Sequence, residues 1–563
     1  MKRRSWLIFA PGVTLALFLL PIGAGLLGTW LPSFGYLPVL GSEAFSLEPW
    51  RALFARPGLV ESLRLTLISG LGGTLLAFAL TIGFVAACHD TRFFAAARRL
   101  LAPLLALPHV AVAIGLAFLI APSGWLLRLV SPWATGLELP PDVATLQDPN
   151  GLALALGLAV KETPFLLLMT LGALGQVRQG ERLATARGLG YGPVAAWLKT
   201  VLPAVYPLIR LPIYAVLAFS LSVVDMAIVL APATPPPLAV QVFNWFYDPD
   251  LALRTVASAG ATLQLGLVIA GIALWRGGEI LLRRLSRGWL TGGWRGWGGG
   301  LSRRFAAAAL SLALALGYGG ILALTLWSFA FRWRYPDALP ASWTLDTWAR
   351  QGDALWRISL TTLAIGLAAA LIALALTLAC LENEKRHGKA PGSRALWLLY
   401  LPLLVPQIGF LFGVQTLGAW SGLDGTWLAV IWSHLLFVLP YAFLALADPY
   451  RALDERYNRA ALCLGASPGR VFWRIKLPLL LRPVLFAGAV AFAVSVAQFL
   501  PTVFAGAGRF TTLTTEAVSL AGGGDRRVIG VYAFLQAALP LAFFALAIAL
   551  PAWRARRLPR AGR

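Results

Sequence analysis

Four polar residues stand inside otherwise apolar stretches of the chain. Lys161 and Glu162 are adjacent in the run 151–174, and Asp225 and Gln498 each follow a Phe-x-x-Ser string. A charged side chain at the centre of a bilayer costs about 2.5–3.5 kcal/mol on insertion scales, and such residues usually mark solute or ion pathways. We therefore take these four residues as candidates for a translocation pathway, and not for the making or breaking of bonds.

Each candidate also has a purely structural interpretation. Adjacent residues do not share a helix face, so Lys161 and Glu162 would meet different neighbours, either as pathway charges or as parts of interhelical pairs. Their counterparts in the second half of the chain, residues 437–438, are apolar, which excludes a symmetric ring of charges. Asp225 and Gln498 hold matching positions, and they fit either a gate in the outer part of a pathway or a polar tether between helices.

Other polar residues in or beside apolar runs fit structural roles better. Gln407 and His434 stand alone in apolar runs, so we expect them to form hydrogen bonds between helices. Arg92, Arg98 and Arg99 stand at the edge of an apolar run, where a solvated anchor at the membrane surface is expected.

No residue pattern in the chain predicts a metal site or an ATP site. The four histidines and three cysteines are scattered, and their spacing indicates neither a disulfide framework nor a metal centre. No Gly-x-x-x-x-Gly-Lys-Ser/Thr loop occurs, and the nearest string, HGKAPGS, lacks the required spacing. We therefore expect no catalytic residue, no metal and no cofactor bound by this chain.

A loop with fixed landmarks occurs twice. LGYGPVAAWLKTVLPAVYP (189–207) and LGASPGRVFWRIKLPLLL (464–481) place Gly, Pro and Leu-Pro at the same internal spacing. In the second copy Gly465 can supply a positive-φ helix stop, Ser467 an N-cap and Pro468 the first helical residue. In the first copy Gly190 stops the helix, Gly192 is a weaker cap and Pro193 begins the next helix.

A short exposed helix presented twice suits docking to a two-fold partner. The predicted docking residues are Gly190, Tyr191, Pro193, Gly465, Ala466, Ser467 and Pro468.

The composition predicts an all-α integral membrane protein. Of 563 residues 58% are hydrophobic and only 13% charged, against about 25% charged in soluble domains. The net charge of +23 does not indicate nucleic-acid binding, because the cations gather at the ends of apolar runs, as in membrane proteins. A span needs about 20 apolar residues, and these runs are too long for barrel strands. Twelve spans are predicted, at 6–30, 60–87, 100–121, 151–174, 204–232, 253–275, 305–330, 356–381, 395–418, 425–448, 482–505 and 528–552.

The cations also predict the orientation of the spans. Lys2, Arg3 and Arg4 place the N-terminus on the inner side, and twelve spans return the Arg-rich C-terminus to that side. The first apolar run is longer than that of a signal peptide and has no clear cleavage site, so we interpret it as a retained span. Residues 276–304 hold seven Arg and one Glu and include GGWRGWGGG, which predicts a flexible inner linker.

The two halves of the chain are similar to each other. SLRLTLISGLGGTLLAFALT (62–81) is similar to SLTTLAIGLAAALIALALT (359–377), and Pro164 and Pro440 hold similar places. Both halves have the same predicted orientation, so they are tandem parallel repeats of six helices related by a pseudo-two-fold axis along the membrane normal. We expect one half at 1–275, the linker at 276–304 and the other half at 305–563.

The repeated loop resembles the EAA loop of ABC importer permeases. RAALCLGASPGRVFWRIKLPLL (459–480) is close to that motif, and ATARGLGYGPVAAWLKTVLPAV (184–205) is a weaker copy. Both copies lack the opening Glu of the motif, which is replaced by Ala184 and Arg459, although Glu181 and Glu455 lie a few residues upstream. The chain as a whole looks like a fused permease of the ferric-iron, thiamine and polyamine branch, and the segment VVDMAIVLAPATPPPLAVQVFNWFYDP (223–249) resembles that of thiamine-type permeases.

The resemblance implies a set of partners and a location. The loops would be coupling helices docked on two ATP-binding subunits, which hold and hydrolyse ATP, so the chain itself is no enzyme. A periplasmic or extracellular solute-binding protein would deliver the substrate, and the resembling permeases suggest a thiamine-like solute or ferric iron. The chain would be a multi-pass protein of the bacterial inner membrane with both termini cytoplasmic. The alternative is a twelve-helix secondary transporter driven by an ion gradient, a fold that also has two parallel halves but does not explain the repeated loops.

Overall fold

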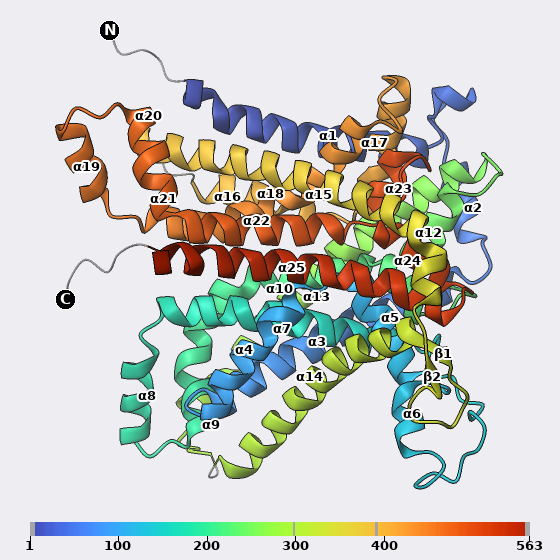
Figure 1. Ribbon diagram of the computed structural model, residues 1–563, viewed down its shortest axis with the longest axis horizontal. Coiled ribbons are helices and arrows are strands. Elements are labelled where there is room, and N and C mark those ends of the chain that lie inside the picture. The colour runs from blue at the N-terminus through green and yellow to red at the C-terminus, as the bar shows by residue number, and fades with distance from the viewer. Residues whose placement is uncertain (1–5, 297–298, 389–391, 558–563) are drawn as a thin grey trace.

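A computed structural model describes residues 6–296, 299–388 and 392–557. Most of the helices lie roughly side by side in one bundle (Figure 1). Within these ranges, ten helices are long and apolar enough to cross a membrane, and two bent helix pairs bring the number to as many as twelve. The strands among the described residues are the short antiparallel pair β1 (Ala330–Arg332) and β2 (Ser342–Trp343). The prediction of an all-α protein with about twelve spans is confirmed.

The element order repeats from one half to the other. The first half contains η1 (Trp6–Phe9), α1 (Ala10–Ser33), η2 (Pro38–Leu40), α2 (Glu48–Phe54), α3 (Leu59–Cys88), α4 (Arg92–Ala106), α5 (His109–Ile120), α6 (Trp125–Val130), α7 (Leu152–Gln176), α8 (Gln179–Gly188), α9 (Pro193–Ala196), the π-helix η3 (Trp197–Val201), α10 (Leu202–Ser222), α11 (Asp225–Leu230), α12 (Leu238–Phe246) and α13 (Leu253–Thr291). The second half contains α14 (Gly300–Phe329), α15 (Asp346–His387), α16 (Ser393–Leu404), α17 (Ile408–Trp420), α18 (Trp427–Arg451), α19 (Glu455–Cys463), α20 (Pro468–Val471), the π-helix η4 (Phe472–Lys476), α21 (Leu477–Leu479), α22 (Leu481–Val496), α23 (Leu500–Gly506), α24 (Leu513–Ala521) and α25 (Arg526–Arg557).

Several predicted spans are interrupted in the structure. The prediction of one span at 100–121 is wrong, because Leu107 and Pro108 separate α4 from α5. The corresponding span at 395–418 bends by 101° between α16 and α17. The spans predicted at 204–232 and 482–505 end earlier, at Ser222 and Val496, and short new helices follow. An apolar run has the same composition on both sides of a break, so hydropathy does not locate these interruptions.

The predicted linker at 276–304 contains regular secondary structure. Helix α13 continues to Thr291, so much of the segment 276–304 is helical. Helix α14 then begins at Gly300, which leaves a short connection that includes 292–296 among the described residues.

The two halves exchange their first helices. Helix α1 packs against α17 of the second half, and α14 packs against α5 of the first half. Figure 1 shows α1 along the edge of the second half and α14 across the first half. The crossings use facing glycines, Gly28 with Gly413 and Gly115 with Gly320, where an added Cβ would lie 2.9 Å from the opposite backbone. Such small residues let membrane helices approach closely.

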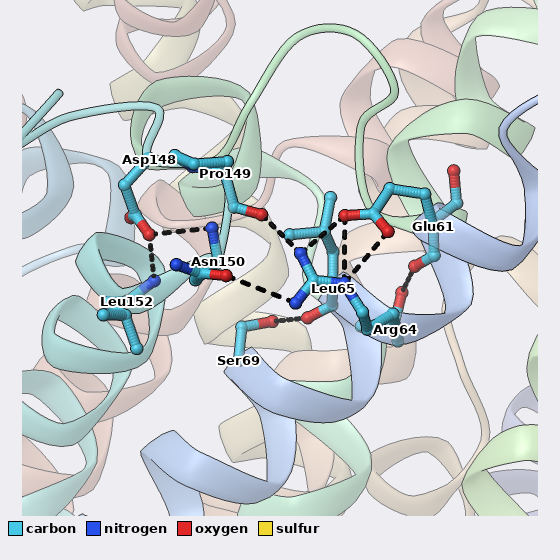
Figure 2. Close-up of polar contacts among 10 residues, drawn as sticks. Glu61, Arg64, Leu65, Ser69, Asp148, Pro149, Asn150 and Leu152 are labelled. Atoms are coloured by element: carbon cyan, nitrogen blue, oxygen red, sulfur yellow. Dashed lines mark hydrogen bonds and ion pairs between the residues drawn. The ribbon is translucent and has the colours of Figure 1, made fainter.

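A polar clamp joins α3 to the start of α7 (Figure 2). Arg64 pairs with Glu61 at 2.6 Å and donates to the Pro149 carbonyl at 2.6 Å. Asp148 accepts hydrogen bonds from the backbone N–H groups of Leu152 and Ala153, at 2.9 and 2.8 Å. Because these N–H groups have no partner within the helix, the carboxylate satisfies the first turn of α7.

Candidate functional site

A central cavity lies between the two halves of the protein. Its volume is about 380 Å³, and its walls are mostly apolar and aromatic. The first half contributes residues from α5, α7, α10 and the start of α11, and the second half contributes residues from α16, α18 and α22. The four pathway candidates Lys161, Glu162, Asp225 and Gln498 all line this one cavity.

Lys161 and Glu162 have different partners, as adjacent residues on a helix should. The Lys161 ammonium donates to the carbonyl of Leu105 at 3.1 Å, at the C-terminal end of α4. A helix C-terminus carries partial negative charge, which stabilises this cation. The Glu162 carboxylate lies 3.2 Å from Nε2 of His109, the first residue of α5. Both residues are 6% exposed.

Asp225 and Gln498 follow the ends of equivalent helices, α10 and α22. The Asp225 carboxylate accepts a hydrogen bond from the backbone N–H of Met226 at 2.8 Å. The Gln498 amide donates to the Val494 carbonyl at 3.0 Å. Each residue is 9% exposed. The breaks after α10 and α22, which hydropathy did not predict, turn the chain so that both residues line the cavity.

Two further polar residues line the cavity at equivalent places. His109 follows Pro108 at the start of α5, and Gln407 follows Pro406 at the start of α17. Sequence reasoning missed His109 and treated Gln407 as a helix-to-helix hydrogen-bond partner. The repeated Pro-His and Pro-Gln pairs were the available signal. His434 fits its expected interhelical role, with hydrogen bonds to Ser495 at 2.8 Å and Thr502 at 2.9 Å.

The two repeated loops have the same backbone geometry. Gly190 and Gly465 have φ of 82° and 83°, in the left-handed region that glycine adopts without strain. Ser467 caps the following helix by accepting from the Arg470 N–H at 3.3 Å, and Pro468 and Pro193 begin α20 and α9. Each short helix continues into a π-helical turn, η3 or η4, a feature common at functional sites. Both loops lie at one end of the bundle, together with the start of α1 and the end of α25 (Figure 1).

A buried charge network supports the second loop. Lys476, the last residue of η4, pairs with Glu382 of α15 at 2.7 Å, and Arg386 contacts the same carboxylate at 2.7 Å. Tyr450 of α18 also donates to Glu382. Glu382 and Lys476 are 3% and 6% exposed. The network therefore ties the loop to two spanning helices.

The first loop has an apolar cluster in place of this network. Aligning the repeats places Ala86, Leu174 and Val201 where the second half has Glu382, Tyr450 and Lys476. All three apolar residues are buried in one hydrophobic cluster. The two loops thus share a backbone but are supported by different interactions.

The connection between the halves packs on the first loop. Lys199 of η3 donates to the carbonyls of Gly292 and Trp294, each at 2.9 Å. The Gly192 N–H donates to the Arg295 carbonyl at 2.8 Å. By contrast, Leu464 beside Gly465 is 87% exposed, and a Cβ added to Gly465 would meet no atom within 4 Å. The first loop is therefore partly covered, while the tip of the second is open.

We expect Lys199→Met to loosen the connection, because the substitution removes both hydrogen bonds to residues 292–294. Trypsin should then cleave at Arg295 several times faster than in the wild type, as measured by the appearance of the two half-chains on a gel. Arg474→Met is the matched control, since Arg474 holds the equivalent place in η4 and is exposed. Equal cleavage of the wild type and Lys199→Met would contradict this role for Lys199.

The two upstream glutamates differ in their surroundings. Glu455 pairs with Lys385 of α15 at 2.9 Å and accepts from Asn458 at 2.8 Å. Burial by itself raises the pKa of the Glu455 carboxyl, but the bonds from Lys385 and Asn458 bring that pKa below its usual value. Glu181 is exposed and lies 3.8 Å from Arg178. Glu455 is thus held within the chain, and Glu181 is free to meet a partner.

Comparisons with known proteins agree with this architecture. Residues 372–554 match the family described as the binding-protein-dependent transport system inner membrane component. The inner membrane ABC transporter permease protein YnjC of Escherichia coli is 36% identical over 524 residues, covering 91% of this chain and 92% of that protein. The thiamine transport system permease protein ThiP of Escherichia coli is 28% identical over 56% of each chain. The molybdenum transport system permease protein ModB of Mycobacterium tuberculosis is 35% identical over 21% of this chain and 49% of its own length.

The similarity to YnjC covers both halves, both loops and the cavity between them. The match to the family extends over the second loop and over α16, α18 and α22, second-half helices that line the cavity. The chain therefore belongs to the family of ABC transporter permeases, and it is a transport subunit and not an enzyme.

Proposed function

We propose that this chain forms the translocation pathway of an ATP-driven importer in a bacterial inner membrane. A solute-binding protein delivers a small solute to one end of the bundle, and the solute passes through the central cavity. Two ATP-binding subunits dock on the two loops at the other end, bind ATP there and drive the cycle. In this orientation both termini are cytoplasmic.

One observation carries the proposal. The residues singled out for a pathway meet in a single cavity between the halves, and the residues singled out for docking meet at one end of the bundle. Closure of two ATP-binding subunits against the loops would move the two halves as rigid bodies around that cavity. Family membership also decides against the alternative of an ion-driven secondary transporter.

The substrate proposed is thiamine-like or ferric iron in class. The similarity to a thiamine transport system permease over about half of each chain supports the first candidate. The aromatic walls of the cavity also suit a thiamine-like solute better than a bare ion.

A pull-down of the cognate ATP-binding subunit tests the docking role. We expect the double variant Gly190→Asp with Gly465→Asp to retain less than a tenth of the ATP-binding subunit that the wild type retains. Aspartate tolerates the left-handed conformation better than most residues, so the loop should keep its backbone conformation while its surface gains a negative charge. Gly522→Asp, at the exposed C-cap of α24, is the control for an added charge. If the double variant is folded and retains the subunit fully, docking lies elsewhere.

A further inference from the structure

The acidic and basic side chains that line the central cavity all come from the first half of the chain. His109, Lys161, Glu162 and Asp225 line it, and the second half places amide or apolar side chains at the equivalent positions: Gln407 for His109, Phe437 and Val438 for Lys161 and Glu162, and Gln498 for Asp225. Two-fold repetition therefore supplies the shape of the cavity, and its charge is one-sided.

Three of these four groups already have partners. Lys161 donates to the carbonyl oxygens at the end of α4, and His109 contacts Glu162. The Asp225 carboxylate has the Met226 backbone N–H as its hydrogen-bond partner, and in the described part of the chain it forms no ion pair with a Lys or Arg side chain. His109 lies close enough to act on Asp225 electrostatically, but its ring contacts Glu162. Asp225 is nevertheless 9% exposed, so its charge is removed from bulk water. A buried carboxylate without a counter-charge is costly, and a cation that enters the cavity relieves that cost.

The rest of the cavity wall suits an apolar or aromatic body. Aromatic side chains from both halves line it, and they are Phe165, Phe219, Phe437, Tyr441, Phe486, Phe499 and Phe544. Aromatic faces attract organic cations, by about 2 kcal/mol or more when the cation is desolvated. An oxyanion would meet Asp225 and Glu162 with like charge, while the Lys161 ammonium is held by the carbonyl oxygens at the end of α4.

We propose that the cavity takes a monovalent organic cation with an apolar or aromatic body, and that Asp225 is its counter-charge. The inference rests on the proposed transport function and names the class of its substrate. It separates this permease from carriers of oxyanions such as molybdate, although molybdenum permeases are among its relatives. Gln498, at the equivalent place in the second half, supplies a neutral amide where a symmetric site would have a second aspartate.

Binding to the purified full-length permease in lipid nanodiscs tests the proposal. The probes are thiamine and benzyltrimethylammonium as cations, benzyl alcohol as the neutral analogue, and molybdate as the anion. The thermal unfolding midpoint is followed against probe concentration to obtain an apparent Kd. We expect at least one cation to bind, and both benzyl alcohol and molybdate to bind at least tenfold more weakly.

Variants assign the effect to Asp225. Asp225→Asn should weaken cation binding at least tenfold, and Gln498→Asp, which adds a second acid, should strengthen it several-fold. Asp250→Asn makes the same chemical change at an exposed residue and should leave the Kd within twofold. The proposal is overturned if no cation binds, or if molybdate or benzyl alcohol binds more strongly than the cations. It is also overturned if Asp225→Asn leaves the Kd for the cation unchanged. Retention of the ATP-binding subunit by the same nanodiscs reports separately on the transport function.

Discussion

Replacing Lys476 by valine should destabilise the second repeated loop (464–481) by about 3 kcal/mol. Breaking a buried ion pair by removing one partner costs about 3–5 kcal/mol, because the other charge stays buried. We take the lower end of this range, since Arg386 and Tyr450 still contact Glu382. The expected result is a lower thermal unfolding midpoint in nanodiscs, together with weaker retention of the ATP-binding subunit.

The first half of the chain provides the rescue. The triple variant Glu382→Ala, Tyr450→Leu and Lys476→Val copies the apolar residues Ala86, Leu174 and Val201, which fill the equivalent space in the first half. A buried charge network replaced by apolar residues is often neutral or stabilising, so the triple variant should recover most of the loss. Arg474→Val, on the exposed side of η4, should change nothing. A single Lys476→Val variant as stable as the wild type would show that the network does not support the loop.

Leucine at Gly25 should prevent close packing of the exchanged helix α1 on the second half. A Cβ at Gly25 would overlap the Phe410 carbonyl and lie 2.7 Å from a Val414 methyl group. Overpacking of a well-packed interior typically lowers the free energy of unfolding by about 1–3 kcal/mol. We expect the upper end of this range, because the new side chain would clash with backbone atoms, which cannot move aside easily. We expect a clearly lower unfolding midpoint and a larger aggregated fraction on size-exclusion chromatography.

Gly23→Leu is the control on the same helix. Gly23 is exposed on the face of α1 that turns away from the protein, and a Cβ there would meet no atom within 4 Å. Both variants add the same apolar mass to α1, so they differ only in what the added side chain meets. Equal unfolding midpoints for Gly25→Leu and Gly23→Leu would contradict the inference that this helix crossing requires a glycine.

Much of the fold follows from the chain alone. Long apolar runs require helices in a bilayer, because each backbone polar group must be paired within its own segment. The repeated Gly, Ser and Pro landmarks predict the stop, cap and start of helices at Gly465, Ser467 and Pro468, since these residues act through local backbone geometry. The family resemblance of the two loops likewise depends on local pattern.

The breaks in the spans could not be predicted in the same way. Val223 and Val224 end α10 within an apolar run, and Asp225 begins a new helix there. Hydropathy depends on composition, which is the same on both sides of the break. The position of the turn instead depends on how the chain packs against the neighbouring helices.

Local patterns in the amino-acid sequence are enough to predict an all-helical membrane protein with two similar halves and two equivalent loops, because periodicity, capping and charge act over a few residues. Three further features emerge only in the folded protein: the first helices are exchanged between the halves, Lys476 is matched by Glu382 from a distant helix, and polar residues from three separate segments share one cavity. These are contacts between residues far apart in the chain. They depend on how side chains of specific shape and charge pack together, and no local pattern encodes that arrangement.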